Sequence, residues 1–203
     1  MDPRQVKRLQ KGPSLVKLGG EKRRCTFLFT DLRGFTALSE KIGPDKVTYI
    51  MNRVLSAQVK AIQKHGGMTD KFIGDAGMFI MGAPLDMEGH EIKAYEAAVD
   101  LIDNVKKVSE ELEAEGLPPV AIGVGINTGT AIVGNMGSET RFDYSAIGNP
   151  VNVAARLESA TKERGVDILI GEETEKYCGY HLKELEPIMV KGKSEPLKIF
   201  TFK

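Results

Sequence analysis

The feature that most constrains the fold of this chain is an apolar strand pattern that ends on a carboxylate. In the stretch FLFTDLRGFT, residues 27–36, three apolar residues lie between the β-branched Thr26 just before it and Thr30, a pattern typical of a buried strand. The apolar run stops at Asp31, and Gly34 interrupts the chain before an expected helix. A carboxylate at the end of a core strand, three residues before a glycine, points to a function beyond packing.

The chain of 203 residues has 28 basic and 28 acidic side chains and therefore no net charge. Long-range attraction to nucleic acid or to an anionic membrane is absent, so we expect neither as the main partner. Cys25 and Cys178 have no metal-ligand spacing, so we expect Cys25 to pack in the core and the protein to occupy a reducing compartment. No apolar run approaches the ~20 residues that span a bilayer, and the N-terminus has no signal-peptide pattern. We therefore expect a cytoplasmic location.

The order of the hydrophobic patterns predicts an α+β fold. Residues 1–22 are basic and rich in proline and glycine, so we interpret them as a lead-in or linker to one domain at residues 23–203. After the first strand, the patterns predict helices at 44–65 and 88–115, with a hairpin around 74–77 between them. A glycine-rich strand at 120–137, a helix at 149–165, a strand at 166–170 and further strands near the C-terminus follow. This order predicts a mostly antiparallel sheet flanked by helices.

Asp31 and Asp75 are the two acidic residues that say most about function. Each follows an apolar strand run and has glycine nearby, Gly34 in one case and Gly74 and Gly77 in the other. If the two strands are neighbours, the carboxylates converge and raise each other's pKa unless a cation lies between them. Mg²⁺ is typically held by one or two carboxylates together with substrate phosphates. The alternative for each residue alone is a turn-capping role.

Gly34 extends this interpretation from a metal to a phosphate. A helix N-terminus presents unpaired N–H groups to anions, and a residue without Cβ lets phosphate oxygens approach. We therefore expect the backbone of Gly34, Phe35 and Thr36 to cradle a polyphosphate whose metal is bound by Asp31.

Asn152 and Arg156 form a second candidate group in NPVNVAARLE. Their spacing places them on one helix face, where arginine can clamp an oxyanion and asparagine can donate to a sugar or phosphate oxygen. The alternative is a solvated helix face with one salt bridge.

Five stretches, taken in order, resemble the signature blocks of the class III adenylyl/guanylyl cyclase catalytic domain: FLFTDLRGFT, DKFIGDA, GINTGTAIVGNMGS, YSAIGNPVNVAARLE and VKGK. The resemblance covers about residues 23–203. It implies a ferredoxin-like βαββαβ core and ATP as the substrate. The preceding segment LVKLGGEKRR resembles the part that joins bacterial catalytic domains to upstream sensor or membrane parts, which implies such a part in the natural chain.

The resemblance assigns roles to individual residues. It gives Asp31 and Asp75 to two divalent ions, Mg²⁺ or Mn²⁺, with the Leu32 carbonyl as a backbone ligand. Lys71 matches the residue that reads the purine, and lysine is the adenylyl-type choice because an ammonium donates to adenine N1. Ser145 matches the partner purine-reading position, where many adenylyl cyclases have aspartate. Because a hydroxyl either donates or accepts, Ser145 leaves guanine open.

The remaining roles concern the sugar and the phosphates. Asn152 matches the residue that orients the ribose, and Arg156 matches the one that stabilises the transition state. Lys191 matches the lysine that binds the terminal phosphates, and Arg141 is a further phosphate-binding candidate.

The implied reaction is attack of the ribose 3′-hydroxyl on the α-phosphorus of ATP, giving cyclic AMP and pyrophosphate for signal transduction. No histidine lies in a motif block, so no side-chain base is expected. The family shares each site between two subunits, with Asp31 and Asp75 from one subunit. The other subunit supplies the remaining side chains: Lys71, Ser145, Asn152, Arg156 and Lys191. A single chain that carries both sets implies a head-to-tail homodimer with two equivalent sites.

Three alternatives remain. A guanylyl cyclase would use GTP, and Lys71 is the residue that discriminates against it. A catalytically silent nucleotide-binding or dimerisation module usually loses a metal aspartate or the arginine, which this chain retains. A cyclic-dinucleotide synthase would carry a Gly-Gly-(Asp/Glu)-Glu-Phe turn, whereas this hairpin contains Gly74-Asp75-Ala76.

Overall fold

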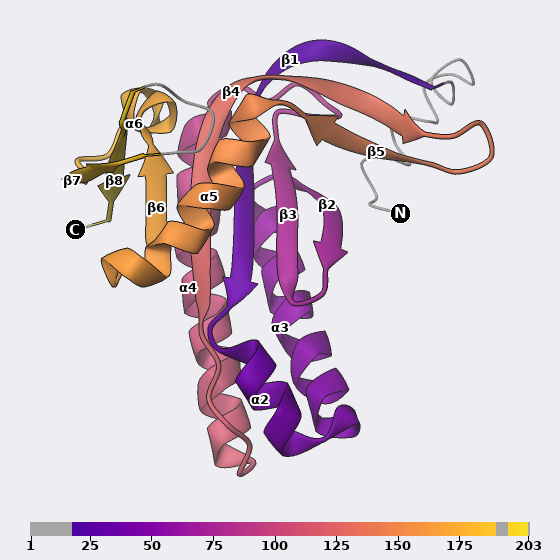
Figure 1. The fold of residues 1–203 in the computed structure, drawn as a ribbon, viewed down its shortest axis with the longest axis vertical. Helices are drawn as coiled ribbons and strands as arrows, with labels where there is room; N and C mark the ends of the chain where they lie inside the picture. The colour runs from indigo at the N-terminus through magenta and orange to yellow at the C-terminus, as the bar shows by residue number, and fades with distance from the viewer. Residues whose placement is uncertain (1–17, 190–194, 203) are drawn as a thin grey trace.

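A computed structural model gives the structure, and it describes residues 18–189 and 195–202 (Figure 1). The strands of the described chain are β1 (Gly19–Leu32), β2 (Met68–Ile73), β3 (Ala76–Met81), β4 (Ile122–Gly137), β5 (Phe142–Ile147), β6 (Ile168–Gly171), β7 (Lys183–Ile188) and β8 (Leu197–Thr201). The helices are α2 (Phe35–Ile42), α3 (Pro44–Lys64), α4 (His90–Ala114), α5 (Asn149–Arg164) and α6 (Glu172–Cys178).

All of these strands belong to one sheet. Its order is β2-β3-β1-β4-β6-β8-β7, and β5 pairs with β4 off this path. The pairs β2–β3, β3–β1 and β1–β4 are antiparallel, whereas β4–β6 is parallel. The prediction of an α+β fold with a βαββαβ core and a mostly antiparallel sheet is therefore confirmed, with the parallel β4–β6 pair making the sheet mixed.

The two faces of the sheet are covered by different helices. Side chains alternate along β1, so Leu28 packs with α3 and α4 while Phe27 packs on the opposite face with α5 and β5. Figure 1 shows α3 and α4 behind the sheet and α5 in front of it. The helix with the predicted catalytic residues therefore lies on the opposite face from the two long helices.

Glycines in β4 explain how closely α5 lies against the sheet. A Cβ at Gly125 would overlap the backbone of α5 at Ala154 and Glu158, and a Cβ at Gly129 would lie 2.5 Å from the Pro150 ring. The glycine-rich pattern of this strand is therefore a packing requirement, and it fixes the depth at which α5 sits.

The β4–β5 hairpin forms an arm that projects from the body of the domain (Figure 1). The outer half of β4 pairs with β5 on one side and with the first residues of β1 on the other, beginning at Gly19–Asn135. The last residues of the segment expected as a lead-in, 19–22, are thus paired in the sheet. A strand forms there because β4 provides a long partner edge.

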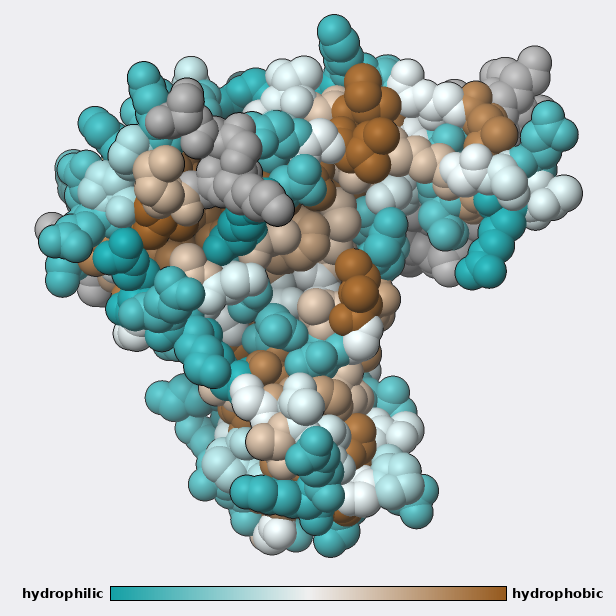
Figure 2. All heavy atoms as spheres, viewed as in Figure 1, coloured by the Kyte–Doolittle hydropathy of each residue, from teal (hydrophilic) through white to brown (hydrophobic). Residues whose placement is uncertain are grey.

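Large hydrophobic side chains are exposed on the face that carries α5. Phe72 and Ile73 at the end of β2 and Ile147 at the end of β5 are 39%, 59% and 59% exposed. Figure 2 shows hydrophobic surface over β2 and where β5 ends before α5. Such grouped exposure marks an interaction surface more often than isolated apolar residues do.

One sequence expectation is wrong in the C-terminal part. Residues 172–178 form the helix α6, although the final forty residues were expected to contain only strands after residue 170. Three acidic residues in the first turn of α6 favour a helix N-terminus, and Cys178 is buried against the sheet. Lys191 lies outside the described residues. Among the described helices, none has a stretch long and apolar enough to cross a membrane.

We predict that Gly125→Ala destabilises the protein by about 2–3 kcal/mol, because the added methyl overlaps α5 backbone atoms that a rotamer change cannot move. Urea unfolding followed by circular dichroism measures this. Thr130→Ala, at an exposed position of the same strand, is the matched control and should change the unfolding midpoint little. Equal stability of the two variants would contradict the close helix–strand contact.

Candidate active site

The structure brings Asp31 and Asp75 together at one end of the sheet. Antiparallel pairing of Thr30 with Gly77 places the end of β1 beside the β2–β3 turn. Asp75 lies in that two-residue turn after Gly74, whose φ of 64° is a conformation that suits glycine at a hairpin turn. The Asp31 and Asp75 carboxyl groups lie close enough that the Asp75 charge acts directly on Asp31. Two carboxyl groups from separate strands thus meet, as expected for neighbouring strands.

The electrostatics of this corner favour a bound cation. Burial, followed by the charge of Asp75, raises the pKa of Asp31 to about 6. Burial, with the Asp31 charge second, raises the pKa of Glu158 on α5 to about 7. Converging carboxylates with raised pKa values are stabilised when a divalent ion enters. The chemistry of the donors, all carboxylate oxygen, fits Mg²⁺ or Mn²⁺.

The pair alone does not complete a coordination shell. In residues 18–189 and 195–202 no group of three or more His, Cys, Asp or Glu side chains is placed to hold an ion. Further ligands would have to be backbone carbonyls such as that of Leu32, water or substrate oxygens. This fits the way Mg²⁺ is bound through one or two carboxylates together with phosphates.

The strand leads from this corner into the N-terminus of α2. Gly34 has φ 66° and open space where a Cβ would be, and no side chain caps the helix. The first helical hydrogen bond runs from Leu38 N–H to the Gly34 carbonyl, so the N–H groups of Phe35 and Thr36 precede the helical bonds. These groups and the open approach at Gly34 suit an anion.

Arg33 is not part of that anion site. Its guanidinium donates to the Val166 carbonyl at 2.9 Å, and its backbone N–H donates to the Ala121 carbonyl at 2.8 Å. The side chain therefore links the end of β1 to the loop before β6. Its positive charge opposes, without cancelling, the rise in the pKa of Asp31 and of Glu158.

Lys71 and Ser145, from β2 and β5, lie in contact. The Lys71 ammonium donates to the Ser145 hydroxyl at 3.0 Å, and that hydroxyl donates to Oδ2 of Asp70 at 2.6 Å. Burial raises the pKa of Asp70, while the Ser145 hydrogen bond and the Lys71 charge oppose this shift. The two predicted purine-reading residues thus form one polar cluster together with a carboxylate that the sequence analysis did not identify.

Asn152 and Arg156 lie one turn apart near the start of α5, the first exposed and the second partly exposed. Arg141 is exposed at the tip of the β4–β5 arm, where the Ser138 N–H donates to its carbonyl at 2.8 Å. Lys191 is outside the described residues, so its position is not part of this arrangement.

Two groups of predicted residues are therefore held separately within one chain. Asp31 and Asp75 contact each other, whereas Lys71 contacts Ser145 and Asp70. Lys71 and Asp75 nevertheless lie on the same hairpin, four residues apart. Each group is a candidate for part of a binding site.

Sequence reasoning missed Asp70 and Glu158. Asp70 adjoins Lys71 in a strand pattern, where neighbouring side chains are expected on opposite faces. Glu158 follows Arg156 by two residues, so it does not share the helix face that the spacing of Asn152 and Arg156 defines. An acidic residue inside each motif was the available signal, and only the structure brings these residues into the site.

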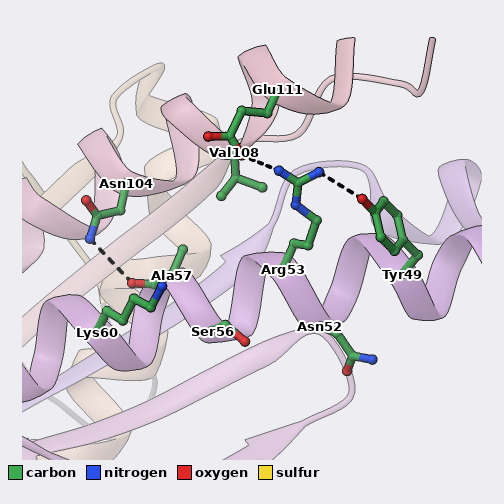
Figure 3. Close-up of a pocket in the computed structure, with 9 residues that line it drawn as sticks. All are labelled: Tyr49, Asn52, Arg53, Ser56, Ala57, Lys60, Asn104, Val108 and Glu111. Atoms are coloured by element: carbon green, nitrogen blue, oxygen red, sulfur yellow. Dashed lines mark hydrogen bonds and ion pairs between the residues drawn. The ribbon is translucent and has the colours of Figure 1, made fainter. Parts of the chain in front are cut away.

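A separate hollow lies between α3 and α4 (Figure 3). Arg53 there donates to the Tyr49 hydroxyl at 3.1 Å and pairs with Glu111 and with Glu115. None of the predicted site residues within 18–189 lines it. Because carboxylates already neutralise the Arg53 guanidinium, we assign this hollow no part in the site.

Comparison with known proteins identifies relatives of the whole described fold. A family model described as the adenylate and guanylate cyclase catalytic domain matches residues 20–203. The chain is 35% identical to an adenylate cyclase of Anabaena cylindrica over 89% of its length, and 37% identical to a terminal-differentiation-specific adenylate cyclase of Dictyostelium discoideum over 88%. It spans only 37% and 8% of the length of these two relatives.

The chain is also similar in structure to solved adenylyl and guanylyl cyclases. The adenylyl cyclase CyaB of P. aeruginosa superposes with a TM-score of 0.84 at 35% identity, covering 90% of this chain and 95% of that chain. The guanylyl cyclase Cya2 superposes with a TM-score of 0.83 at 33% identity, covering 90% and 93%. A bacterial light-regulated adenylyl cyclase superposes with a TM-score of 0.87 at 26% identity, covering 99% of this chain and 57% of that chain. The chain is almost equally similar to the adenylyl cyclase CyaB and to the guanylyl cyclase Cya2. The choice between adenine and guanine must therefore be inferred from the residues of the candidate site.

We predict that Asp31→Asn raises the melting temperature of the metal-free protein by about 2–4 °C, because it removes one of two like charges held in contact. Mg²⁺ or Mn²⁺ should raise the melting temperature of the wild type and have a much smaller effect on the variant. Thermal unfolding with and without EDTA measures both effects.

Asp103→Asn, at an exposed position of α4, is the matched control and should keep the full response to metal. If Asp31→Asn keeps the same metal-induced shift as the control, the ions do not bind at the Asp31–Asp75 pair.

Proposed function

The chain belongs to the adenylate and guanylate cyclase catalytic-domain family, and we propose that it is an adenylate cyclase that converts ATP into 3′,5′-cyclic AMP and pyrophosphate. The observation that carries the proposal is the presence of two separately held groups in one chain. One is the Asp31–Asp75 carboxylate pair, and the other is the Lys71–Ser145 pair, to which the proposal adds Asn152 and Arg156 of α5. Together they supply a metal–phosphate half and a base–ribose half.

Asp31 and Asp75, with the Leu32 carbonyl, would hold two Mg²⁺ or Mn²⁺ ions. When bound, such ions favour ionisation of the ribose 3′-hydroxyl and neutralise charge on the triphosphate. The N–H groups of Phe35 and Thr36, with the open approach at Gly34, would bind phosphate oxygens.

The other residues position the nucleotide and stabilise developing charge. Asn152 would orient the ribose, and Arg156 would offset the charge that grows on the α-phosphate as the 3′-oxygen attacks. The new bond joins the 3′-oxygen to the α-phosphorus, and the bond that breaks is the one to the oxygen shared with the β-phosphate. Lys191 and Arg141 remain candidates for binding the terminal phosphates.

Two of the three histidines are engaged away from the candidate site. His65 Nε2 contacts Asp100 at 2.7 Å, and His90 Nδ1 contacts Thr26 at 2.8 Å. These contacts support the expectation that the 3′-hydroxyl proton leaves to water or to the substrate itself, without a histidine base.

The different contacts of Lys71 and Asp75 support a site shared between two subunits. On one hairpin, Lys71 contacts Ser145 and Asp70, whereas Asp75 lies beside Asp31. In a head-to-tail homodimer, each of two equivalent sites would combine the metal-binding group of one subunit with the base-binding group of the other. The exposed apolar residues Phe72, Ile73 and Ile147 flank these groups and suit burial against such a copy. The light-regulated relative, matched over 57% of its chain, supports the expectation of a sensor part in the natural protein.

Guanylate cyclase activity is the second candidate, because Cya2 is as similar to this chain as CyaB is. Lys71 favours ATP, since its ammonium can donate to adenine N1, whereas guanine carries a hydrogen at that position. A silent nucleotide-binding module is less well supported, because Asp31, Asp75, Asn152 and Arg156 are all present.

We predict that the purified protein with Mn²⁺ or Mg²⁺ forms cyclic AMP from ATP about tenfold or more faster than cyclic GMP from GTP. Mass spectrometry of the products after parallel incubations measures this. A preference for GTP would replace the proposal by the guanylate cyclase alternative, and formation of neither product would favour the silent module.

We predict that Asp31→Ala and Arg156→Ala proteins are each nearly inactive and regain activity when mixed. In a random mixture half of the dimers are heterodimers and one of their two sites is intact, so about a quarter of the wild-type activity returns. Cyclase assays after subunit exchange, followed by fluorescence energy transfer, measure this.

The matched control is a mixture of Asp31→Ala and Asp75→Ala proteins. Both substitutions fall in the same half of the site, so no heterodimer site is intact and activity should stay at the level of the separate variants. Equal recovery in the two mixtures would contradict a site shared between subunits.

A further inference from the structure

Asp70 is a buried carboxylate beside the purine-reading residues, and the proposed function gives it no role. Its side chain is 0% exposed, its Oδ2 accepts the Ser145 hydroxyl hydrogen at 2.6 Å, and its Oδ1 lies 3.5 Å from the Lys71 ammonium. Burial of a carboxylate is unfavourable by several kcal/mol unless it is paired and hydrogen-bonded. A group of this kind at the base-reading position therefore suggests a function in recognition.

A local irregularity in β2 places Asp70 there. Thr69 pairs with Phe79 and Lys71 with Met78, so two residues separated by Asp70 oppose consecutive residues of β3. Asp70 is thus the extra residue of a β-bulge, which redirects side chains that would otherwise alternate. Both Asp70 and Lys71 reach Ser145 as a result.

The contacts of Ser145 determine what its hydroxyl can still do. A serine hydroxyl has one hydrogen and two lone pairs. The hydrogen is directed to the Asp70 carboxylate, in a short bond of the charge-assisted kind, and the Lys71 ammonium donates to one lone pair. Only a lone pair remains, so the hydroxyl can accept a further hydrogen bond and cannot donate one.

Lys71 has the opposite property. Its ammonium has three N–H bonds and no lone pair. One N–H is directed to Ser145, and the ammonium forms an ion pair with Oδ1 of Asp70, which accepts no hydrogen bond within the described residues, while 41% of the Lys71 side chain stays exposed. The remaining N–H groups can only donate. The cluster thus offers an acceptor at Ser145 and a donor at Lys71, side by side.

We infer that Asp70 is a positioning residue that holds the Ser145 hydroxyl as an acceptor and thereby makes the base pocket specific for adenine. The 6-amino group of adenine donates and its N1 accepts, which complements Ser145 and Lys71. Guanine has O6 in place of the amino group and a hydrogen on N1, so both contacts would be mismatched. The inference rests on the proposed function for the position of the base, and it removes the ambiguity that a serine leaves in the sequence.

The test compares kcat/KM for ATP and for GTP in wild type and in Asp70→Asn. The neutral amide keeps the shape of the side chain but binds the hydroxyl less strongly and can itself donate, so Ser145 becomes free to donate to guanine O6. We expect the ATP-to-GTP ratio of kcat/KM to fall roughly 10- to 100-fold, mainly through loss of activity with ATP. Equal losses with both nucleotides would indicate a merely structural role and overturn the inference.

A double-mutant cycle tests whether Asp70 affects nucleotide specificity through Ser145. Ser145→Ala should lower the same ratio, and adding Asp70→Asn to Ser145→Ala should change it no further. Asp143→Asn is the matched control, because Asp143 is an exposed carboxylate whose charge acts on Asp70. A shift of the ratio by Asp143→Asn as large as that by Asp70→Asn would show a general charge effect and contradict the inference.

Asp70→Asn combined with Ser145→Asp provides a second variant should Asp70→Asn fold poorly. An aspartate at position 145 is an obligatory acceptor that needs no neighbour to orient it, so this variant should recover the preference for ATP. Failure of a folded double variant to prefer ATP over GTP would overturn the inference. Circular dichroism and thermal unfolding establish folding for every variant.

Binding of 3′-deoxy-ATP and 3′-deoxy-GTP, which cannot cyclise, separates this inference from the proposed function. Wild type should bind the adenine analogue more tightly, and Asp70→Asn should reduce that preference, even in a protein that forms no cyclic product. If the wild-type protein forms no cyclic product but shows this binding pattern, the cyclase proposal is refuted and the inference about Asp70 stands. Equal binding of both analogues by wild type would refute the role of Asp70.

Discussion

The antiparallel pairing of β1 with β4 is the constraint on which the rest of the structure depends. The two strands pair from Gly19–Asn135 to Leu32–Ile122 and so determine where every neighbour can attach. β3 pairs with the other edge of β1 and brings Asp75 to Asp31, while β5 pairs with the outer half of β4 and carries Ser145. The glycines on β4 let α5 lie directly on the same strand. The candidate groups are therefore positioned by backbone hydrogen bonds and close packing.

The β2–β3 hairpin carries two groups of opposite chemistry that do not neutralise each other. Asp75 is held beside another carboxyl group, a contact that raises the pKa of Asp31, whereas Lys71 is held by Asp70 and Ser145. The first arrangement is complemented by a divalent cation and the second by a hydrogen-bond acceptor. In the proposed function, a metal-bound nucleotide would supply both, and in a homodimer it would meet one group from each subunit. The hairpin links the two halves of the proposed chemistry.

The sequence predicted the larger elements well because their patterns are long. The apolar stripe of α3, the run of β1 and the hairpin turn at Gly74 each repeat a period or a turn signal over enough residues to be recognised. The seven-residue helix α6 was missed because so short a segment contains fewer than two full turns of pattern. Asp70 was missed for a different reason. Its burial depends on a bulge in β2 and on a contact with a residue 75 positions away.

The sequence by itself determined the class of fold from its hydrophobic patterns and indicated the family through five motif blocks in order, and it predicted candidate residues for binding metal, phosphate and base. Only the tertiary structure decided which of those residues meet. It brought Asp31 to Asp75, placed Lys71 against Ser145 and Asp70, and fixed the Ser145 hydroxyl through Asp70. The reason is physical: a hydroxyl can donate or accept in isolation, and only its neighbours in space determine which of the two it does.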